Sequence, residues 1–152
     1  MARWFNIAGP CFPSEHYMIP VARRAVEVVE LLSQGRWFSL VSGRQTGKTT
    51  VVQSLADELS ARSDDLVLWV DLETARGIDD PREAFATILW VFERTLTLHA
   101  PTLRRPSDEE VARMLQVPTE ALVSYLGAVC AASDRPVVLL LDEADVLTGP
   151  AM

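Results

Sequence analysis

Two short stretches of this chain combine residue types that could handle a nucleotide. Residues 42–49 read Ser-Gly-Arg-Gln-Thr-Gly-Lys-Thr, and residues 137–143 read Val-Val-Leu-Leu-Leu-Asp-Glu. The first stretch is typical of a phosphate-binding loop, in which backbone N–H groups surround a phosphate at the start of a helix. The second is typical of a strand whose acidic end holds magnesium and activates water. Together the two stretches predict a site for a nucleotide.

Four residues of the first stretch have a chemical role in such a loop. Gly43 and Gly47 permit positive φ, or a close approach to phosphate that a side chain would prevent. Lys48 supplies a mobile charge for the β- and γ-phosphates, and the Thr49 hydroxyl would complete the magnesium shell. The strict pattern has Gly where this chain has Ser42. Whether the stretch is a phosphate-binding loop therefore depends on the secondary structure predicted on either side of it. The alternative is a turn in which Gly-Lys-Thr occurs by chance.

The elements expected around this stretch favour the loop. The mostly apolar run 37–41 predicts a buried strand before it, and apolar residues at helical spacing predict a helix after it. That helical stripe consists of Val52, Leu55, Ala56 and Leu59. Strand, glycine-containing loop and helix form the context in which the motif binds phosphate.

The acidic stretch indicates the same chemistry. Five apolar residues precede Asp142, which suits a strand covered on both faces, as in a parallel sheet. Asp142 would hold magnesium through water, and Glu143 would polarise the attacking water. The alternative is an ordinary strand followed by a solvated acidic turn, and the presence of the loop argues against it.

The rest of the chain alternates strands with helices, which predicts an α/β fold with a parallel sheet. Residues 1–20 have an irregular pattern, Pro20 opens a helix, and Gly35 ends it. A second strand covers 66–70 and is closed by Asp71-Leu72-Glu73.

Three further helix starts can be recognised in the second half. Asp80 precedes a helix with Pro81 and Glu83 in its first turn. Ser107 and Glu110 predict a capping box, and Pro118 starts the helix before the acidic strand. The apolar stripes expected on the helices, in chain order, are Val21, Ala25, Val28, Val29 and Leu32; Phe85, Ile88, Leu89, Phe92 and Leu96; and Leu122, Leu126 and Val129.

Composition narrows the class of protein. The chain has 152 residues and 49% apolar content, enough for one compact domain with a sizeable core. Its net charge of −7 argues against broad electrostatic binding to nucleic acid. Cys11 and Cys130 fit a reducing cytoplasm better than a disulfide framework. No signal-peptide pattern and no membrane-length apolar run occur, so we expect no membrane partner.

With these motifs in place, the chain resembles the AAA-like P-loop ATPases of the additional-strand class. The resemblance covers nearly the whole chain and rests on Phe5-Asn6-Ile7-Ala8-Gly9-Pro10, His16-Tyr17-Met18-Ile19-Pro20, Arg44-Gln45-Thr46-Gly47-Lys48-Thr49-Thr50 and Leu141-Asp142-Glu143-Ala144-Asp145. In that class the loop is called Walker A and the acidic strand end Walker B. The resemblance implies one P-loop NTPase domain over 1–152 with a three-layer α/β fold. Residues 1–35 would form an N-terminal segment and helix, and 36–152 a partial ATPase core.

The resemblance also implies ligands and residue roles. ATP would bind through Gly43, Arg44, Gln45, Thr46, Gly47, Lys48, Thr49 and Thr50. Thr49 and Asp142 would hold magnesium, and Glu143 would be the catalytic base. His16 and Tyr17 precede the first helix, where such proteins often contact adenine, and local packing explains these two residues equally well.

The family sheet also has a strand between the loop strand and the acidic strand, which comes later in sequence and carries a polar sensor. That strand and an arginine finger do not fit into 144–152, so we expect the N-terminal part of an ATPase core, truncated after the Walker B strand. Hydrolysis would then need a complete form, further copies of the chain, or a complementing chain. The rival hypothesis is a non-hydrolysing nucleotide-binding or protein-interaction module. Asp142 to Asp145 also spell a helicase box, an interpretation we discount because the chain is acidic and holds no second helicase domain.

Overall fold

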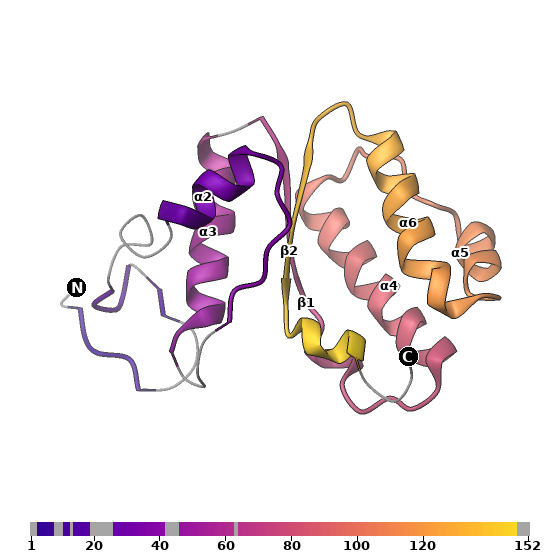
Figure 1. Cartoon of the computed structure of the whole chain (residues 1–152), viewed down its shortest axis with the longest axis horizontal. Coiled ribbons are helices and arrows are strands. Elements are labelled where there is room, and N and C mark those ends of the chain that lie inside the picture. The colour runs from indigo at the N-terminus through magenta and orange to yellow at the C-terminus, as the bar shows by residue number, and fades with distance from the viewer. Residues whose placement is uncertain are drawn as a thin grey trace. The chain divides into compact units, whose positions relative to one another are not determined.

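The structure is a computed structural model that describes residues 3–7, 11–12, 14–18, 26–41, 46–62 and 64–148. The chain divides into two compact units, Met1–Ala61 and Arg62–Met152. The described residues form five α-helices and a two-stranded parallel sheet, which confirms the predicted α/β class (Figure 1). The second unit holds the sheet, and the first holds the residues that follow the glycine loop.

The second unit contains both strands and most of the helices. Its elements are β1 (Leu66–Asp71), the 3-10 helix η1 (Glu73–Ala75), α4 (Pro81–His99), α5 (Asp108–Met114), α6 (Pro118–Ala132), β2 (Val137–Asp142) and the 3-10 helix η2 (Ala144–Thr148). β1 and β2 pair in parallel, in a register that runs from Leu66 opposite Val137 to Asp71 opposite Asp142. Because parallel strands need a long crossover, the three helices between them are what allows this pairing. The carboxyl ends of both strands therefore lie together.

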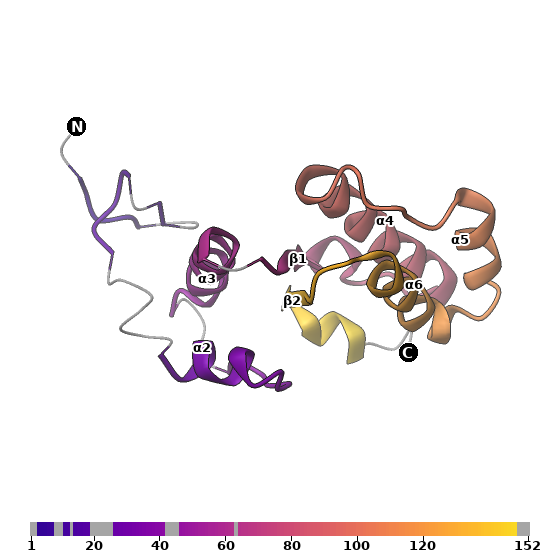
Figure 2. The ribbon, with the colours of Figure 1, turned by 90° about the horizontal axis from the view of Figure 1, so that it is seen from above.

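Helices α4 and α6 cover one face of this sheet, and α5 packs beside α6 (Figures 1 and 2). The core between them is made by alternate residues of β1, by α4 and by α6. All five residues of the predicted α4 stripe are buried, namely Phe85, Ile88, Leu89, Phe92 and Leu96. Local sequence also fixes the helix starts, because the Asp80 side chain accepts from two N–H groups of α4 and Ser107 with Glu110 forms the predicted capping box on α5.

The buried face of α6 matches the prediction at Val129 and is shifted by one residue at the other two predicted positions. Its fully buried residues are Ala121, Tyr125 and Val129, whereas Leu122 and Leu126 are half-buried beside them. Tyr125 can occupy the centre because its hydroxyl donates to Glu93 Oε2 of α4 at 2.8 Å. Burying a phenol costs little free energy when its hydroxyl has a hydrogen-bond partner. A pattern based on apolar residues alone therefore does not identify Tyr125 as part of the buried face.

The first unit contains α2 (Val26–Ser33) and α3 (Lys48–Arg62). Gly35 ends α2 as predicted: its φ is +63°, its N–H donates to Leu32, and the Arg36 N–H donates to Leu31. These two hydrogen bonds are typical of a helix that ends in a residue with left-handed backbone conformation, which glycine adopts without strain. The predicted helix start at Pro20 and the stripe positions Val21 and Ala25 lie outside the described residues. Of the other stripe positions, Val28 and Leu32 are half-buried and Val29 is exposed.

The strand predicted over 37–41 was wrong. The segment has no strand geometry, Trp37 is 100% exposed and Val41 is 87% exposed. A strand needs a neighbour to satisfy its backbone N–H and C=O groups, and β2 pairs with β1 instead. Within the described part of the chain no strand pairs with 37–41, so its apolar pattern has no sheet to join.

Candidate functional site

The part of the glycine loop that the structure describes leads straight into a helix. Ser42, Gly43, Arg44 and Gln45 lie outside the described residues, and the described chain resumes at Thr46. Gly47 has φ +81°, and α3 begins at the next residue, Lys48. The Val51 N–H donates to the Gly47 carbonyl at 3.0 Å, as at the start of a regular helix.

The first turn of α3 consists of the predicted phosphate ligands. Lys48, Thr49 and Thr50 are its first three residues. N–H groups in the first turn of a helix have no partner four residues earlier, and the helix dipole adds partial positive charge there. Such a turn suits an anion. Thr50 has a further contact, since its Oγ1 accepts the Cys11 N–H at 3.3 Å and so ties the N-terminal segment to α3.

His16 and Tyr17 have different surroundings. His16 is buried, with 6% exposure, and its Nδ1 accepts the Phe12 N–H at 2.9 Å. The His16 ring lies edge-on to Trp4, with 4.9 Å between the ring centroids. Tyr17 is 56% exposed and lies against Phe5, with centroids 5.0 Å apart. Packing therefore accounts for His16, whereas the Tyr17 ring is accessible to a ligand.

The acidic end of β2 is built from two residues in contrasting settings. Asp142 is the last residue of the strand and is only 7% exposed. Its Oδ1 accepts the N–H of Glu143 at 3.1 Å. It lies opposite Asp71 in the register, so the two aspartates share one face at the carboxyl end of the sheet.

Glu143 turns the chain out of the strand with φ +54°. Among the described residues it is the one non-glycine position with positive φ. A left-handed backbone is costly for residues with a side chain, and such positions gather at functional sites. The carboxylate of Glu143 is thus aimed by an unusual backbone geometry rather than by a regular strand.

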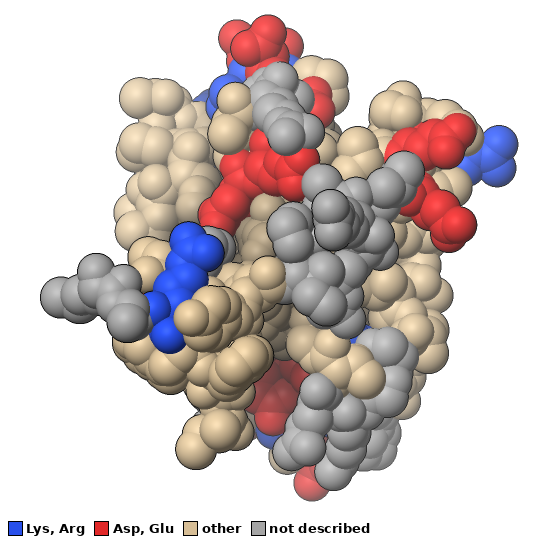
Figure 3. Space-filling model, turned by 90° about the vertical axis from the view of Figure 1, so that its left-hand side faces the viewer, with Lys and Arg blue, Asp and Glu red and all other residues tan. Residues whose placement is uncertain are grey.

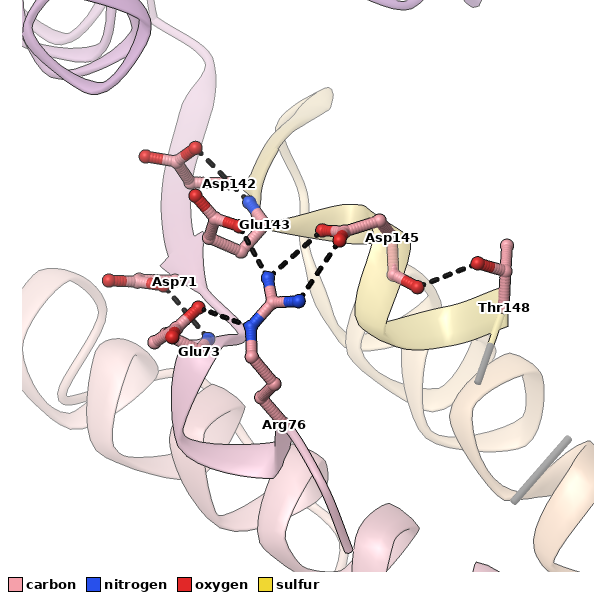
Figure 4. A network of polar contacts seen from close by, with 7 residues as sticks. All are labelled: Asp71, Glu73, Arg76, Asp142, Glu143, Asp145 and Thr148. Atoms are coloured by element: carbon pink, nitrogen blue, oxygen red, sulfur yellow. Dashed lines mark hydrogen bonds and ion pairs between the residues drawn. The ribbon is translucent and has the colours of Figure 1, made fainter. Parts of the chain in front are cut away.

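One arginine holds the segments after both strands together (Figure 4). Arg76 follows η1, and its Nη2 lies 2.5 Å from Glu143 Oε2. Its Nη1 and Nη2 also donate to the two oxygens of Asp145, at 3.1 and 3.2 Å, and its Nε donates to Glu73 Oε2 at 2.8 Å. The hydrogen bonds from Arg76 hold the pKa of the Asp145 carboxyl below its usual range. Three carboxylates thus share one guanidinium beside Asp142.

Sequence reasoning missed Arg76 as a member of this group. Glu73 and Arg76 stand three residues apart after a predicted strand, a spacing that allows a local ion pair. Nothing in that spacing points to Glu143 or Asp145, because those residues lie more than sixty positions away. Asp71 was recognised as the end of a strand, and its alignment with Asp142 became visible only with the register.

Figure 3 shows the charged side chains on one face of the molecule. On the face drawn in Figure 3, most described side chains are uncharged, and Lys and Arg side chains stand apart from one another. None of the described helices is both long enough and apolar enough to cross a membrane. The described residues contain no group of three or more His, Cys, Asp and Glu side chains that could hold a metal by themselves.

Comparison with known proteins adds nothing to this geometry. The chain matches no known family, no characterised protein and no solved structure.

Proposed function

We propose that this protein binds ATP with magnesium through residues 43–50, in the manner of a P-loop NTPase. The observation that carries the proposal is the start of α3: Gly47 has positive φ, and Lys48 and Thr49 follow as the first two residues of the helix. This arrangement puts backbone N–H groups, a helix dipole and a lysine at the start of one helix, which are the features that bind a polyphosphate in such loops. The likeness to AAA-like ATPases supplies the finer assignment to ATP.

The proposal gives magnesium two protein ligands of suitable chemistry, each considered by itself. Thr49 of the first unit has a hydroxyl and Asp142 of the second has a buried carboxylate, and both are hard oxygen ligands of the kind that magnesium prefers. Magnesium commonly takes one or two protein ligands and completes its shell with water and nucleotide phosphates, so it does not need three clustered acidic residues. Bound there, magnesium would neutralise phosphate charge.

In this proposal Glu143 is the general base that polarises a water molecule for attack on the γ-phosphate. Glu143 follows Asp142 directly in the chain and would act from the turn after the strand. Hydrolysis belongs to a complete or complemented form of the protein, because charge on the γ-phosphate must also be stabilised. The rival function, a nucleotide-binding or interaction module without hydrolysis, shares the binding step and lacks the turnover.

Binding is tested by titration with a fluorescent ATP analogue, with and without magnesium. Lys48→Ala should weaken binding at least tenfold, because it removes the ammonium group beside the β- and γ-phosphates. Arg36→Ala is the matched control, since it removes one positive charge from an exposed residue outside the loop. Equal affinity of wild type and Lys48→Ala for the analogue would show that the loop does not bind the nucleotide.

Lys48 also permits a direct chemical test, because it is the only lysine in the chain. An amine-directed reagent can modify Lys48 and the N-terminus and no other side chain of this protein. Mg-ATP should slow modification of Lys48 and leave the N-terminus unaffected. Equal protection of both amines would point to a general effect of the nucleotide.

A further inference from the structure

One side of α4 faces away from the core and carries a regular row of side chains. The other side of the helix packs against β1 and α6. The outward row, which we call the outer stripe of α4, consists of Glu83, Thr87, Trp90, Arg94 and Leu98. These residues are spaced three or four positions apart, so they lie on one side of the helix. Thr87 is half-buried and the others are exposed.

The side chains at the middle and the end of the outer stripe have the character of an interface. Trp90 is 56% exposed and Leu98 is 71% exposed. The Arg94 guanidinium lies over the Trp90 ring, with 5.8 Å between Cζ and the ring centroid. This cation–π contact restrains both side chains in the free protein, which lowers the entropy cost of binding a partner. Tryptophan and arginine are also enriched among the residues that dominate binding energy at protein interfaces.

The charges of the outer stripe are ordered so that they match a second copy of the same helix. Glu83 and Arg94 form no ion pair within the described part of the chain. Glu83 lies as far before the point midway between Thr87 and Trp90 as Arg94 lies after it. If two copies of α4 run antiparallel about a twofold axis at that point, each Glu83 lies opposite an Arg94. Each Trp90 then lies opposite a Thr87.

We propose that the outer stripe of α4 is a homodimer interface, in which two copies of the chain pair their α4 helices antiparallel about a twofold axis. The two Trp90 side chains lie near the centre, and the two Glu83–Arg94 pairs flank them. A parallel arrangement would instead bring like charges together, which is unfavourable. The inference is independent of the proposed function, because the outer stripe contains none of the proposed nucleotide or metal ligands.

Sedimentation velocity of the full chain over a concentration series tests the inference by measuring the dissociation constant of the dimer. Trp90→Ala should raise this constant about thirtyfold, the usual effect of truncating a dominant aromatic residue at an interface. Trp37→Ala is the matched control, because Trp37 is 100% exposed and lies outside the stripe. It should leave the constant unchanged. Far-UV circular dichroism shows whether each variant keeps its helices.

Charge reversal tests the antiparallel register. Glu83→Arg and Arg94→Glu should each weaken self-association at least about tenfold, because each places two pairs of like charges across the interface. An equimolar mixture of these two variants should form dimers about as tightly as wild type, since every pair across the mixed interface is again opposite in sign. Arg82→Glu reverses a charge in the first turn of α4 outside the stripe and should have no effect.

Three results would overturn the inference. The first is a wild type that stays monomeric throughout the concentration series. The second is a dimer whose dissociation constant is the same in Trp90→Ala as in wild type. The third is a mixture of the two charge-reversal variants that associates no better than either variant alone. The third result remains decisive even if one substitution weakens the helix, because each variant in the mixture is compared with itself.

Discussion

At the scale of single residues, Glu143 is the position where backbone and side chain are both constrained. Its φ of +54° is a conformation that non-glycine residues avoid, and the Val146 N–H donates to its carbonyl at 3.1 Å at the start of η2. The strand before it ends with a buried aspartate. This combination separates the two carboxylates, so that Asp142 stays with the sheet and Glu143 belongs to the following turn.

We therefore predict that Glu143→Gln impairs turnover and spares binding. The substitution keeps the shape of the side chain and removes its ability to accept a proton. In a form of the protein that hydrolyses ATP, the rate should fall by about 10²–10⁴, the usual contribution of a general base. Single-turnover assays and the fluorescent titration measure the two quantities separately.

The matched control for this prediction is Glu109→Gln in the first turn of α5, which removes an exposed carboxylate. It should change neither rate nor affinity. Undiminished hydrolysis in Glu143→Gln would assign the base to another group.

At the scale of elements, α4 and α6 are held together by one polar contact within an apolar interface. Tyr125 of α6 is 1% exposed, and its hydroxyl donates to Glu93 of α4. Glu93 also pairs with Arg105, whose Nη1 lies 2.8 Å from Glu93 Oε1. Burial, followed by the hydrogen bond to Glu93, raises the pKa of Tyr125 above its ordinary value. The phenol therefore stays protonated in the folded state.

We predict that Tyr125→Phe lowers the free energy of unfolding by about 1 kcal/mol, the usual net value of a hydrogen bond whose partner can still reach water. Urea unfolding measures the change. Tyr17→Phe is the control, because the chain has two tyrosines and Tyr17 is exposed. It should alter stability by less than about 0.5 kcal/mol. Equal losses in both variants would contradict the role given to Tyr125.

The same residue predicts a pH dependence. In the unfolded chain Tyr125 loses its proton near its ordinary pKa of about 10, whereas the folded protein retains it. The stabilising contribution of Tyr125 is complete below that pH and is lost as pH rises through the raised folded-state pKa. Wild type should thus lose stability more steeply than Tyr125→Phe in alkaline urea titrations. Parallel curves would show that Tyr125 titrates alike in both states.

Secondary-structure elements that are determined by neighbouring residues could be predicted from the sequence. Elements that depend on a partner far away in the chain could not. Asp80, Ser107 and Glu110 act within one helical turn, so their caps could be read from the sequence. The run 37–41 has the composition of a strand, but its strand geometry depends on a neighbour that the described residues do not supply.

The candidate functional residues likewise include some that were predictable from local sequence and some that were not. The turn from Gly47 into α3 and the end of β2 at Asp142 follow from adjacent residues. The link between Arg76 and Glu143 joins positions that only the parallel register brings together. A spacing rule along the chain cannot predict it.

At the scale of the whole molecule, the described sheet is small for the chemistry proposed. β2 pairs with β1, and no described strand pairs with its other edge. The proposed ATPase function calls for a further strand beside the acidic strand, which would carry a sensor residue. The arginine beside Glu143 already contacts three carboxylates and is poorly suited to stabilise phosphate charge.

We therefore predict slow ATP hydrolysis by the chain alone. An arginine finger typically contributes ~10³–10⁵ in rate. Arg76, the arginine beside Glu143, is already occupied by carboxylates, so turnover should stay near background. If further copies of the chain complete the site, the rate per molecule should rise with protein concentration. Phosphate release across a concentration series, with the oligomeric state measured in parallel, tests this. Fast turnover in a verified monomer, independent of concentration, would contradict it.

Trp69 has a consequence for spectroscopy. It lies in β1 opposite Leu140, two residues before Asp71, and its Nε1–H is buried without an acceptor among the described residues. The other tryptophans, Trp4, Trp37 and Trp90, are all exposed. A variant with phenylalanine at those three positions would have one indole, on the same face of the sheet as Asp71 and Asp142. Its emission wavelength and quenching would then report on the surroundings of that face in real time, without an added dye.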